Sequence, residues 1–122
     1  MIIGNDYAYN TNPVLQYSSL TYYKNTSISG TASFQYITND WLNLSSLTQF
    51  GLYPSFGDID GDNDDDLILG NADGTLIFYK NVGGATPNFV FSNPVFQSID
   101  VGNNAAPQIV DVDRDGKNDL LI

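Results

Sequence analysis

The chain contains no cysteine and no histidine, and only four of its 122 residues are basic. Without cysteine or histidine there is no thiol chemistry, no zinc site of the usual kind and no catalytic triad with a histidine base. Nucleic-acid binding is disfavoured, because contacts to phosphates need clustered lysine and arginine. No apolar run is long enough to indicate a transmembrane segment or a signal peptide. If the protein is exported, we expect its signal to lie outside this sequence.

Acidic residues are abundant, but they are confined to two places. All 14 acidic residues are aspartates, and ten of them fall within two nine-residue segments, 58–66 and 111–119. The formal net charge of −10 is therefore local rather than spread over the surface. Binding of two divalent ions would bring this charge to about −6, because each ion adds two positive charges.

The two acidic segments share one spacing, with aspartate at positions 1, 3, 5 and 9, and they begin 53 residues apart. A tight loop with this spacing aims side-chain oxygens at one point, and hard divalent cations prefer oxygen ligands. The sequence therefore predicts two loops that each bind a hard divalent cation.

Two other interpretations of the acidic segments are disfavoured. An EF-hand would need a glutamate at position 12 and flanking helices, but position 12 is Leu69 or Ile122, and strand-like residues follow each loop. A disordered acidic tract is disfavoured by the duplicated spacing and by the apolar residues Ile59 and Val112 at position 2.

Short apolar and aromatic runs alternate with clusters of glycine, asparagine, proline and serine, a pattern typical of many short strands joined by turns. The segment Ser19–Asn25 matches Thr75–Asn81, which indicates an internal repeat. The expected strands are one leading into each loop (54–58, 107–111), one leaving it (66–69, 119–122, and also 1–4), an aromatic one (19–24, 75–80) and a fourth (33–37, and 89–92 with an extension to 99).

These strands predict an all-β chain of antiparallel four-stranded units, about two repeats in all. The first repeat, 1–53, begins at the strand that leaves the loop and lacks its own acidic loop. The second, 54–106, is complete and contains loop 58–66. The third begins at 107–122 and contains loop 111–119.

The segment Pro54–Asn71, followed by Gly74–Gly83, resembles the FG-GAP/VCBS repeat, and Pro107–Ile122 fits the same pattern. The resemblance covers almost the whole chain, apart from apparent insertions at 5–18 and 38–50. It implies blades of a β-propeller, as in integrin α-subunits and many large secreted bacterial proteins. Two blades do not close a ring, since propellers have about four to eight.

The resemblance also implies calcium, about two ions per chain, with ligands that can be assigned residue by residue. The expected first set is Asp58, Asp60, Asp62, Asp66 and the backbone carbonyl of Asp64; the second is Asp111, Asp113, Asp115, Asp119 and the backbone carbonyl of Lys117. The resemblance also implies a positive φ at position 6, which Gly116 supplies and which Asn63, a departure from the usual glycine, tolerates. Without metal we expect the first loop to open, because six carboxylates within nine residues repel one another.

The function expected from the resemblance is that of a calcium-stabilised, non-catalytic extracellular module for adhesion, ligand binding or surface scaffolding, secreted or at the cell surface. An enzyme is disfavoured, because the aspartates are assigned to metal and the usual activating bases are missing. The alternatives are a self-assembling subunit of a filament or fibril, and a non-catalytic part of a secreted carbohydrate-active enzyme.

Expected partners are neighbouring repeats or copies of the chain, bound through open blade edges, and a glycan or protein ligand. Trp41, Tyr7 and Tyr9 lie in the insertions and are the better candidates for a ligand surface. The aromatics at equivalent repeat positions are expected to pack between blades instead: Tyr22, Tyr23, Phe34, Phe78, Tyr79 and Phe89.

Overall fold

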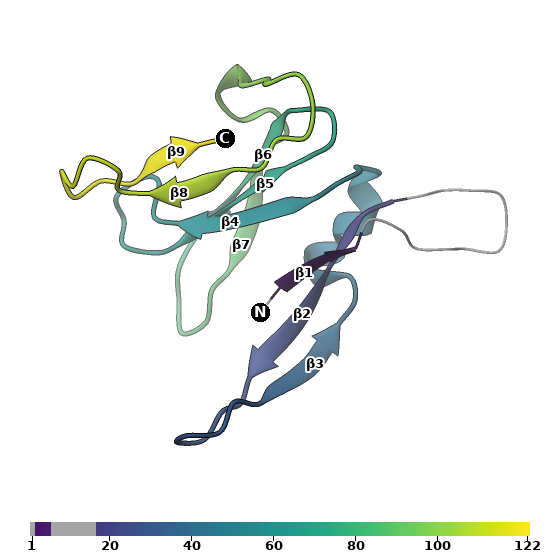
Figure 1. Ribbon diagram of the computed structural model, residues 1–122, viewed down its shortest axis with the longest axis vertical. Coiled ribbons are helices and arrows are strands. Elements are labelled where there is room, and N and C mark those ends of the chain that lie inside the picture. The colour runs from purple at the N-terminus through teal and green to yellow at the C-terminus, as the bar shows by residue number, and fades with distance from the viewer. Residues whose placement is uncertain (1, 6–16) are drawn as a thin grey trace, which may run out of the picture. The chain divides into compact units, whose positions relative to one another are not determined.

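The structure is a computed structural model that describes residues 2–5 and 17–122, and its regular secondary structure is mostly β-strand (Figure 1). The chain divides into two compact units, Met1–Leu52 and Tyr53–Ile122. Among the described residues, no helix has the length and apolar character needed to cross a membrane. The assignment of the segments 1–53, 54–106 and 107–122 to successive repeats stays a prediction.

The first unit contains a three-stranded antiparallel sheet in the order β1 (Ile2–Asn5), β2 (Ser19–Asn25) and β3 (Phe34–Thr38). A 3₁₀ segment, η1 (Trp41–Leu47), contacts β2. Leu20 of β2 and Leu44 of η1 are both fully buried, which gives this unit a small apolar core.

The second unit is built on a four-stranded antiparallel sheet in chain order: β4 (Tyr53–Gly57), β5 (Asp66–Gly70), β6 (Leu76–Asn81) and β7 (Phe89–Asn93). All five residues of β5 are buried. A strand with neighbours on both sides and both faces covered is expected to be a continuous apolar run, and Leu67–Leu69 fits that description.

A two-stranded antiparallel sheet, β8 (Gln108–Val110) and β9 (Asp119–Leu121), packs beside β4 in the same unit. The backbone N–H of Ile109 donates to the hydroxyl of Ser55 at 3.1 Å. A Cβ atom at Gly57 would collide with the side chain of Ile109, so this close approach of β4 and β8 requires glycine. The core of the unit joins both sheets. It consists of Ile68, Leu76 and Ala105, with Ile59, Phe78, Phe96, Ile99, Ile109 and Leu120 packed against them.

The repeat seen in the sequence is also a repeat in strand pairing. A register shift interrupts the pairing of β2 with β3 between Tyr22 and Tyr23. The same irregularity occurs between Phe78 and Tyr79, where β6 pairs with β7. Thus β2 and β6 are equivalent in local geometry as well as in sequence.

The recurring aromatics pair between adjacent strands of one sheet. Tyr23 contacts Tyr36 edge-on, with ring centroids 5.8 Å apart. Tyr79 contacts Phe91 in the same way at 5.4 Å. In both pairs the partner ring comes from the neighbouring strand of the same sheet, and the expectation that the recurring aromatics also pack between blades stays a prediction.

The expected fold class is confirmed: the described chain is mostly β, with a four-stranded antiparallel sheet that is not closed on itself. The expected strands occur within two residues of their predicted bounds. The extension of the fourth strand to residue 99 is wrong. That strand ends at Asn93, whose side chain accepts the N–H of Val95 at 2.9 Å, and Pro94 has no N–H to continue the pairing. A 3₁₀ segment, η2 (Phe96–Ser98), follows.

Candidate metal centre

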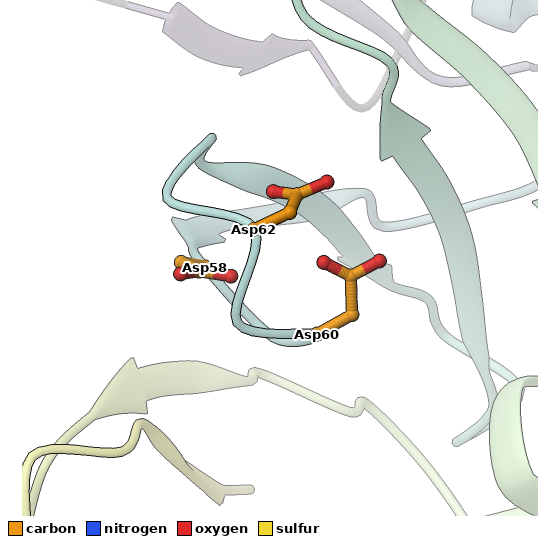
Figure 2. Close-up of side chains that lie close together, drawn as sticks. All are labelled: Asp58, Asp60 and Asp62. Atoms are coloured by element: carbon orange, nitrogen blue, oxygen red, sulfur yellow. The ribbon is translucent and has the colours of Figure 1, made fainter.

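Each acidic loop connects two paired antiparallel strands, β4 with β5 and β8 with β9. In the first loop, carboxylate oxygens of Asp58, Asp60 and Asp62 lie within 4.8 Å of one another, and Figure 2 shows the three side chains around one turn of chain. We call this set the first triad. Ca²⁺ binds oxygens at about 2.3–2.6 Å, so oxygens on opposite sides of one ion are about 5 Å apart. The first triad is therefore compatible with a single ion.

The second loop repeats this arrangement with Asp111, Asp113 and Asp115, whose carboxylate oxygens also lie within 4.8 Å of one another. We call this set the second triad. In both triads the position-1 aspartate is half-buried and the other two are exposed. The loops thus bring together the aspartates at positions 1, 3 and 5, in agreement with their shared spacing.

The position-1 carboxylate organises each loop by accepting a backbone N–H from position 6. Asp58 accepts the N–H of Asn63 at 2.9 Å. Asp111 accepts the N–H of Gly116 at 3.0 Å. An aspartate that bonds to backbone groups a few residues ahead favours a tight turn, and the same bond in both loops curls the chain around the carboxylates.

In both loops the position-5 carboxylate accepts the backbone N–H of position 7. Asp62 accepts the N–H of Asp64 at 3.0 Å, and Asp115 accepts the N–H of Lys117 at 2.8 Å. These bonds fix the peptide at position 7, where the family resemblance implies a carbonyl ligand. The assignment of the Asp64 and Lys117 carbonyls as ligands stays a prediction.

Two residues in each loop adopt the left-handed backbone conformation. At position 6, Asn63 has φ 70° and Gly116 has φ 88°, which confirms the expected positive φ. At position 4, Gly61 has φ 83° and Arg114 has φ 64°. Position 4 was not anticipated, although Gly61 was a visible signal. Each loop therefore has one glycine and one residue with a side chain at these two strained positions.

The position-9 aspartates close the loops, but they are not part of either triad. Asp66 accepts the N–H of Ile59 at 3.4 Å, and Asp119 accepts the N–H of Val112 at 2.9 Å. Asp66 is fully buried, whereas Asp119 is exposed. Their expected role as metal ligands stays a prediction.

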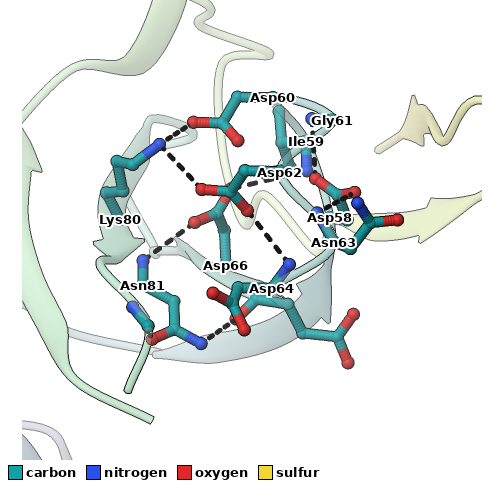
Figure 3. Close-up of polar contacts among 12 residues, drawn as sticks. Asp58, Ile59, Asp60, Gly61, Asp62, Asn63, Asp64, Asp66, Lys80 and Asn81 are labelled. Carbon is teal, nitrogen blue, oxygen red and sulfur yellow. Dashed lines mark hydrogen bonds and ion pairs between the residues drawn. The ribbon is translucent and has the colours of Figure 1, made fainter.

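Asp66 is anchored by Asn81, at the end of β6. The backbone N–H of Asn81 donates to Asp66 at 2.8 Å, and its side-chain amide donates to the carbonyl of Asp65 at 3.1 Å (Figure 3). The side-chain oxygen of Asn81 accepts the N–H of Asn88 at 2.9 Å. Burial raises the pKa of Asp66, and the N–H bonds oppose that rise. Asn81 therefore ties the first loop to the neighbouring strand.

Lys80, next to Asn81 on β6, supplies a cation to the first triad. Its ammonium group forms an ion pair with Asp60 and lies 3.1 Å from Oδ2 of Asp62 (Figure 3). Hydrogen bonds to Asp60 and Asp62 raise the pKa of Lys80. The pKa of Asp62 is lowered by the N–H of Asp64 and then by Lys80.

Lys80 and Asn81 were not predicted from the sequence as part of the site. The signal that could have found them was the recurrence of Tyr-Lys-Asn, at 23–25 and again at 79–81. Of the ligand-surface candidates, Trp41 packs on Tyr22 with ring centroids 6.0 Å apart. Tyr7 and Tyr9 lie outside the described residues.

The two loops lie next to each other. The side-chain amide of Asn118 donates to the backbone carbonyl of Asp58 at 2.9 Å. Segments 58–61 and 116–118 together line a hollow of about 340 Å³. A change in either loop can therefore reach the other through a direct contact.

Strand, acidic loop and strand recur along this chain, and each loop gathers three carboxylates. This combination defines an all-β repeat protein with candidate cation-binding loops. Residues 58–122, just over half of the chain, match the family model described as FG-GAP-like repeat, and the chain belongs to this family. The resemblance to the FG-GAP repeat drawn from the sequence is thereby confirmed over these residues. No curated protein and no solved structure matches the chain.

Proposed function

We propose that this chain is a calcium-binding, non-catalytic extracellular repeat module, in which each triad holds one Ca²⁺. The observation that carries the proposal is the duplicated triad: positions 1, 3 and 5 converge in both loops, with the same backbone bonds to positions 1, 5 and 9. A disordered, solvated acidic tract would not be expected to form the same hydrogen-bond pattern twice.

The donor set supports calcium. Each loop offers only oxygen atoms, which suit Ca²⁺ and Mg²⁺ rather than zinc or copper. Calcium accepts six to eight oxygens in flexible geometry, whereas Mg²⁺ demands a near-ideal octahedron and keeps several waters. Loops with four aspartates at positions 1, 3, 5 and 9, and a fixed peptide at position 7, supply enough oxygens for the larger ion.

The role of the ion would be structural. Each loop connects two paired strands, so neutralising the carboxylates of the loop relieves their repulsion at a strand junction. Because the ligands converge only when the loop is folded, the free energy of metal binding becomes free energy of folding. For a secreted or cell-surface module we expect dissociation constants of about 0.1–1 mM, the range typical of extracellular calcium modules.

The edge strand β7 offers a surface to which another strand could bind. Val90 and Phe91 on β7 are 47% and 48% exposed, and β7 stands at one edge of the four-stranded sheet. An open edge with exposed apolar side chains is a template for another strand. We infer that a neighbouring repeat or a second copy of the chain binds there, so a self-assembling structural subunit is the second candidate function. A glycan or protein ligand would be the target of the adhesion role.

Calcium titration by calorimetry tests the first proposal. The unaltered chain is expected to bind about two Ca²⁺, and Asp60→Ala and Asp113→Ala are each expected to abolish one site. Asp73→Ala, an exposed aspartate outside both loops, is the matched control and should bind as the unaltered chain does. Full binding by both loop variants would refute the assignment.

Light scattering with and without chelator tests self-assembly. A mass that grows with protein concentration and falls after Val90→Lys would support the second candidate, since edge lysine opposes strand pairing. A monomer at all concentrations would exclude it while leaving the calcium proposal intact.

A further inference from the structure

Lys80 gives the first triad a cation that the second triad does not have. Its ammonium group contacts Asp60 and Asp62, two of the three carboxylates that converge in the first loop. In residues 2–5 and 17–122, no ion pair is formed by Arg114 or Lys117, although both belong to the second loop.

The contact has an electrostatic consequence in either of two arrangements. If a divalent ion entered the first triad and Lys80 withdrew, two ion pairs would be lost. If Lys80 stayed on Oδ2 of Asp60 and Asp62, an ammonium and a dication would stand a few ångströms apart. Both arrangements weaken the binding of the ion. The same ammonium also offsets repulsion among the first-loop carboxylates when no ion is bound.

We propose that Lys80 is a built-in competing cation, which lowers the calcium affinity of the first loop and stabilises that loop in its metal-free form. The inference rests on the proposed function, because it concerns the ion that the first triad would hold. It deepens that function by making the calcium affinity of the first loop depend on a residue of β6, outside the acidic loop.

Two other roles for Lys80 make different predictions. If Lys80 positioned the carboxylates for the ion, its removal would weaken calcium binding. If it only packed on the surface, its removal would leave the calcium affinity unchanged. Only a competing cation gives tighter calcium binding together with a less stable metal-free protein.

The test isolates the first loop by using the Asp113→Ala background, in which the second site is removed. Lys80→Met and Lys80→Gln in this background should each bind Ca²⁺ about tenfold more tightly in a calorimetric titration. This is the effect expected from removing one like charge a few ångströms from the ion near solvent. Lys80→Arg retains the charge and should stay within about twofold of the background affinity.

Lys24→Met is the matched control. Lys24 holds the equivalent place in the Tyr-Lys-Asn segment of β2 and is exposed there. Its replacement should leave the calcium affinity of the first loop unchanged. A tenfold gain with Lys24→Met as well would show a general effect of net charge and would overturn the role of Lys80.

Thermal unfolding gives a second readout. In chelator, Lys80→Met should unfold at a lower temperature than its background, and the rise in melting temperature on adding calcium should be larger. Unchanged or weaker calcium affinity in the neutral variants, beside a measurable site in the background, would overturn this inference alone. No heat from the background or from either neutral variant would overturn both this inference and the proposed function.

Discussion

The two acidic loops are alike within themselves and differ in what surrounds them. Both gather aspartates from positions 1, 3 and 5, and both use the same backbone bonds to do so. The first loop, however, lies against β6, which buries Asp66 and brings Lys80 to the triad. In the second loop Asp119 is exposed, and β9 pairs with β8 alone among the described strands.

The difference shows that triad geometry and triad environment have separate origins. Geometry comes from the spacing within nine residues, so it recurs wherever the spacing recurs. Environment comes from the strand that pairs beside the loop, and it sets burial, charge and local stability. The loops should therefore respond alike to changes at position 1. They should respond differently at positions 3 and 5, where only the first loop contacts Lys80, and at position 9, where only Asp66 is buried.

Removal of calcium is expected to have the largest effect. At calcium concentrations about 100 times the dissociation constants, two sites stabilise the folded chain by about 5 kcal/mol, and chelator abolishes this contribution. Urea denaturation with calcium and with chelator measures it. A free energy of unfolding that is the same in both conditions would contradict calcium-linked folding.

Hydrogen exchange in chelator would sharpen the comparison between the loops. The amides of Asn63 and Gly116 are matched probes, because each donates to the position-1 aspartate of its own loop. Asn63 should keep more protection, since Lys80 and Asn81 still hold the first loop. The sequence alone predicted that the first loop opens by repulsion. Earlier loss of protection at Asn63 would favour that view.

Alanine substitutions at position 9 should show the largest difference between the loops in loss of stability. Asp66→Ala leaves the buried N–H of Asn81 without its acceptor and should lower the free energy of unfolding in chelator by about 2 kcal/mol. Asp119→Ala removes an exposed carboxylate and should cost less than about 0.5 kcal/mol. Asp66→Asn keeps one acceptor oxygen and should fall between them. Equal losses for the two alanine variants would show that β6 gives the first loop no added stability.

The local part of this architecture could be predicted from the sequence. The strands beside each loop, the triad positions and the positive φ of Asn63 and Gly116 follow from patterns spanning about ten residues. The burial of Asp66 and the contact of Asn118 with Asp58 depend on which segments meet in space. Spacing along the chain cannot show those meetings, although the repeated Tyr-Lys-Asn segment marked one of them.

Asn118→Ala should break the direct link between the loops. The lost bond from its amide to the carbonyl of Asp58 should lower the free energy of unfolding by about 1 kcal/mol, the usual net value of a single hydrogen bond. Asn103→Ala, at another exposed asparagine of the same unit, is the control and should have little effect. Equal stability of the two variants in urea denaturation would mean that the contact adds no stability to the unit.

Glycine substitutions at the left-handed positions should have the smallest effect, a slight increase in the free energy of unfolding. Arg114 has φ 64° and Asn63 has φ 70°, and a residue with a side chain is strained there by about 1 kcal/mol or more. Glycine removes the strain, but it adds about 0.4–1 kcal/mol of entropy to the unfolded chain. The net gain for Arg114→Gly should be about 0.5 kcal/mol, since the two contributions partly cancel. Asn63→Gly should gain less, because asparagine tolerates this conformation better than arginine does. A larger gain at Asn63 than at Arg114, measured by urea denaturation in calcium, would show that side-chain contacts rather than backbone strain decide stability at these positions.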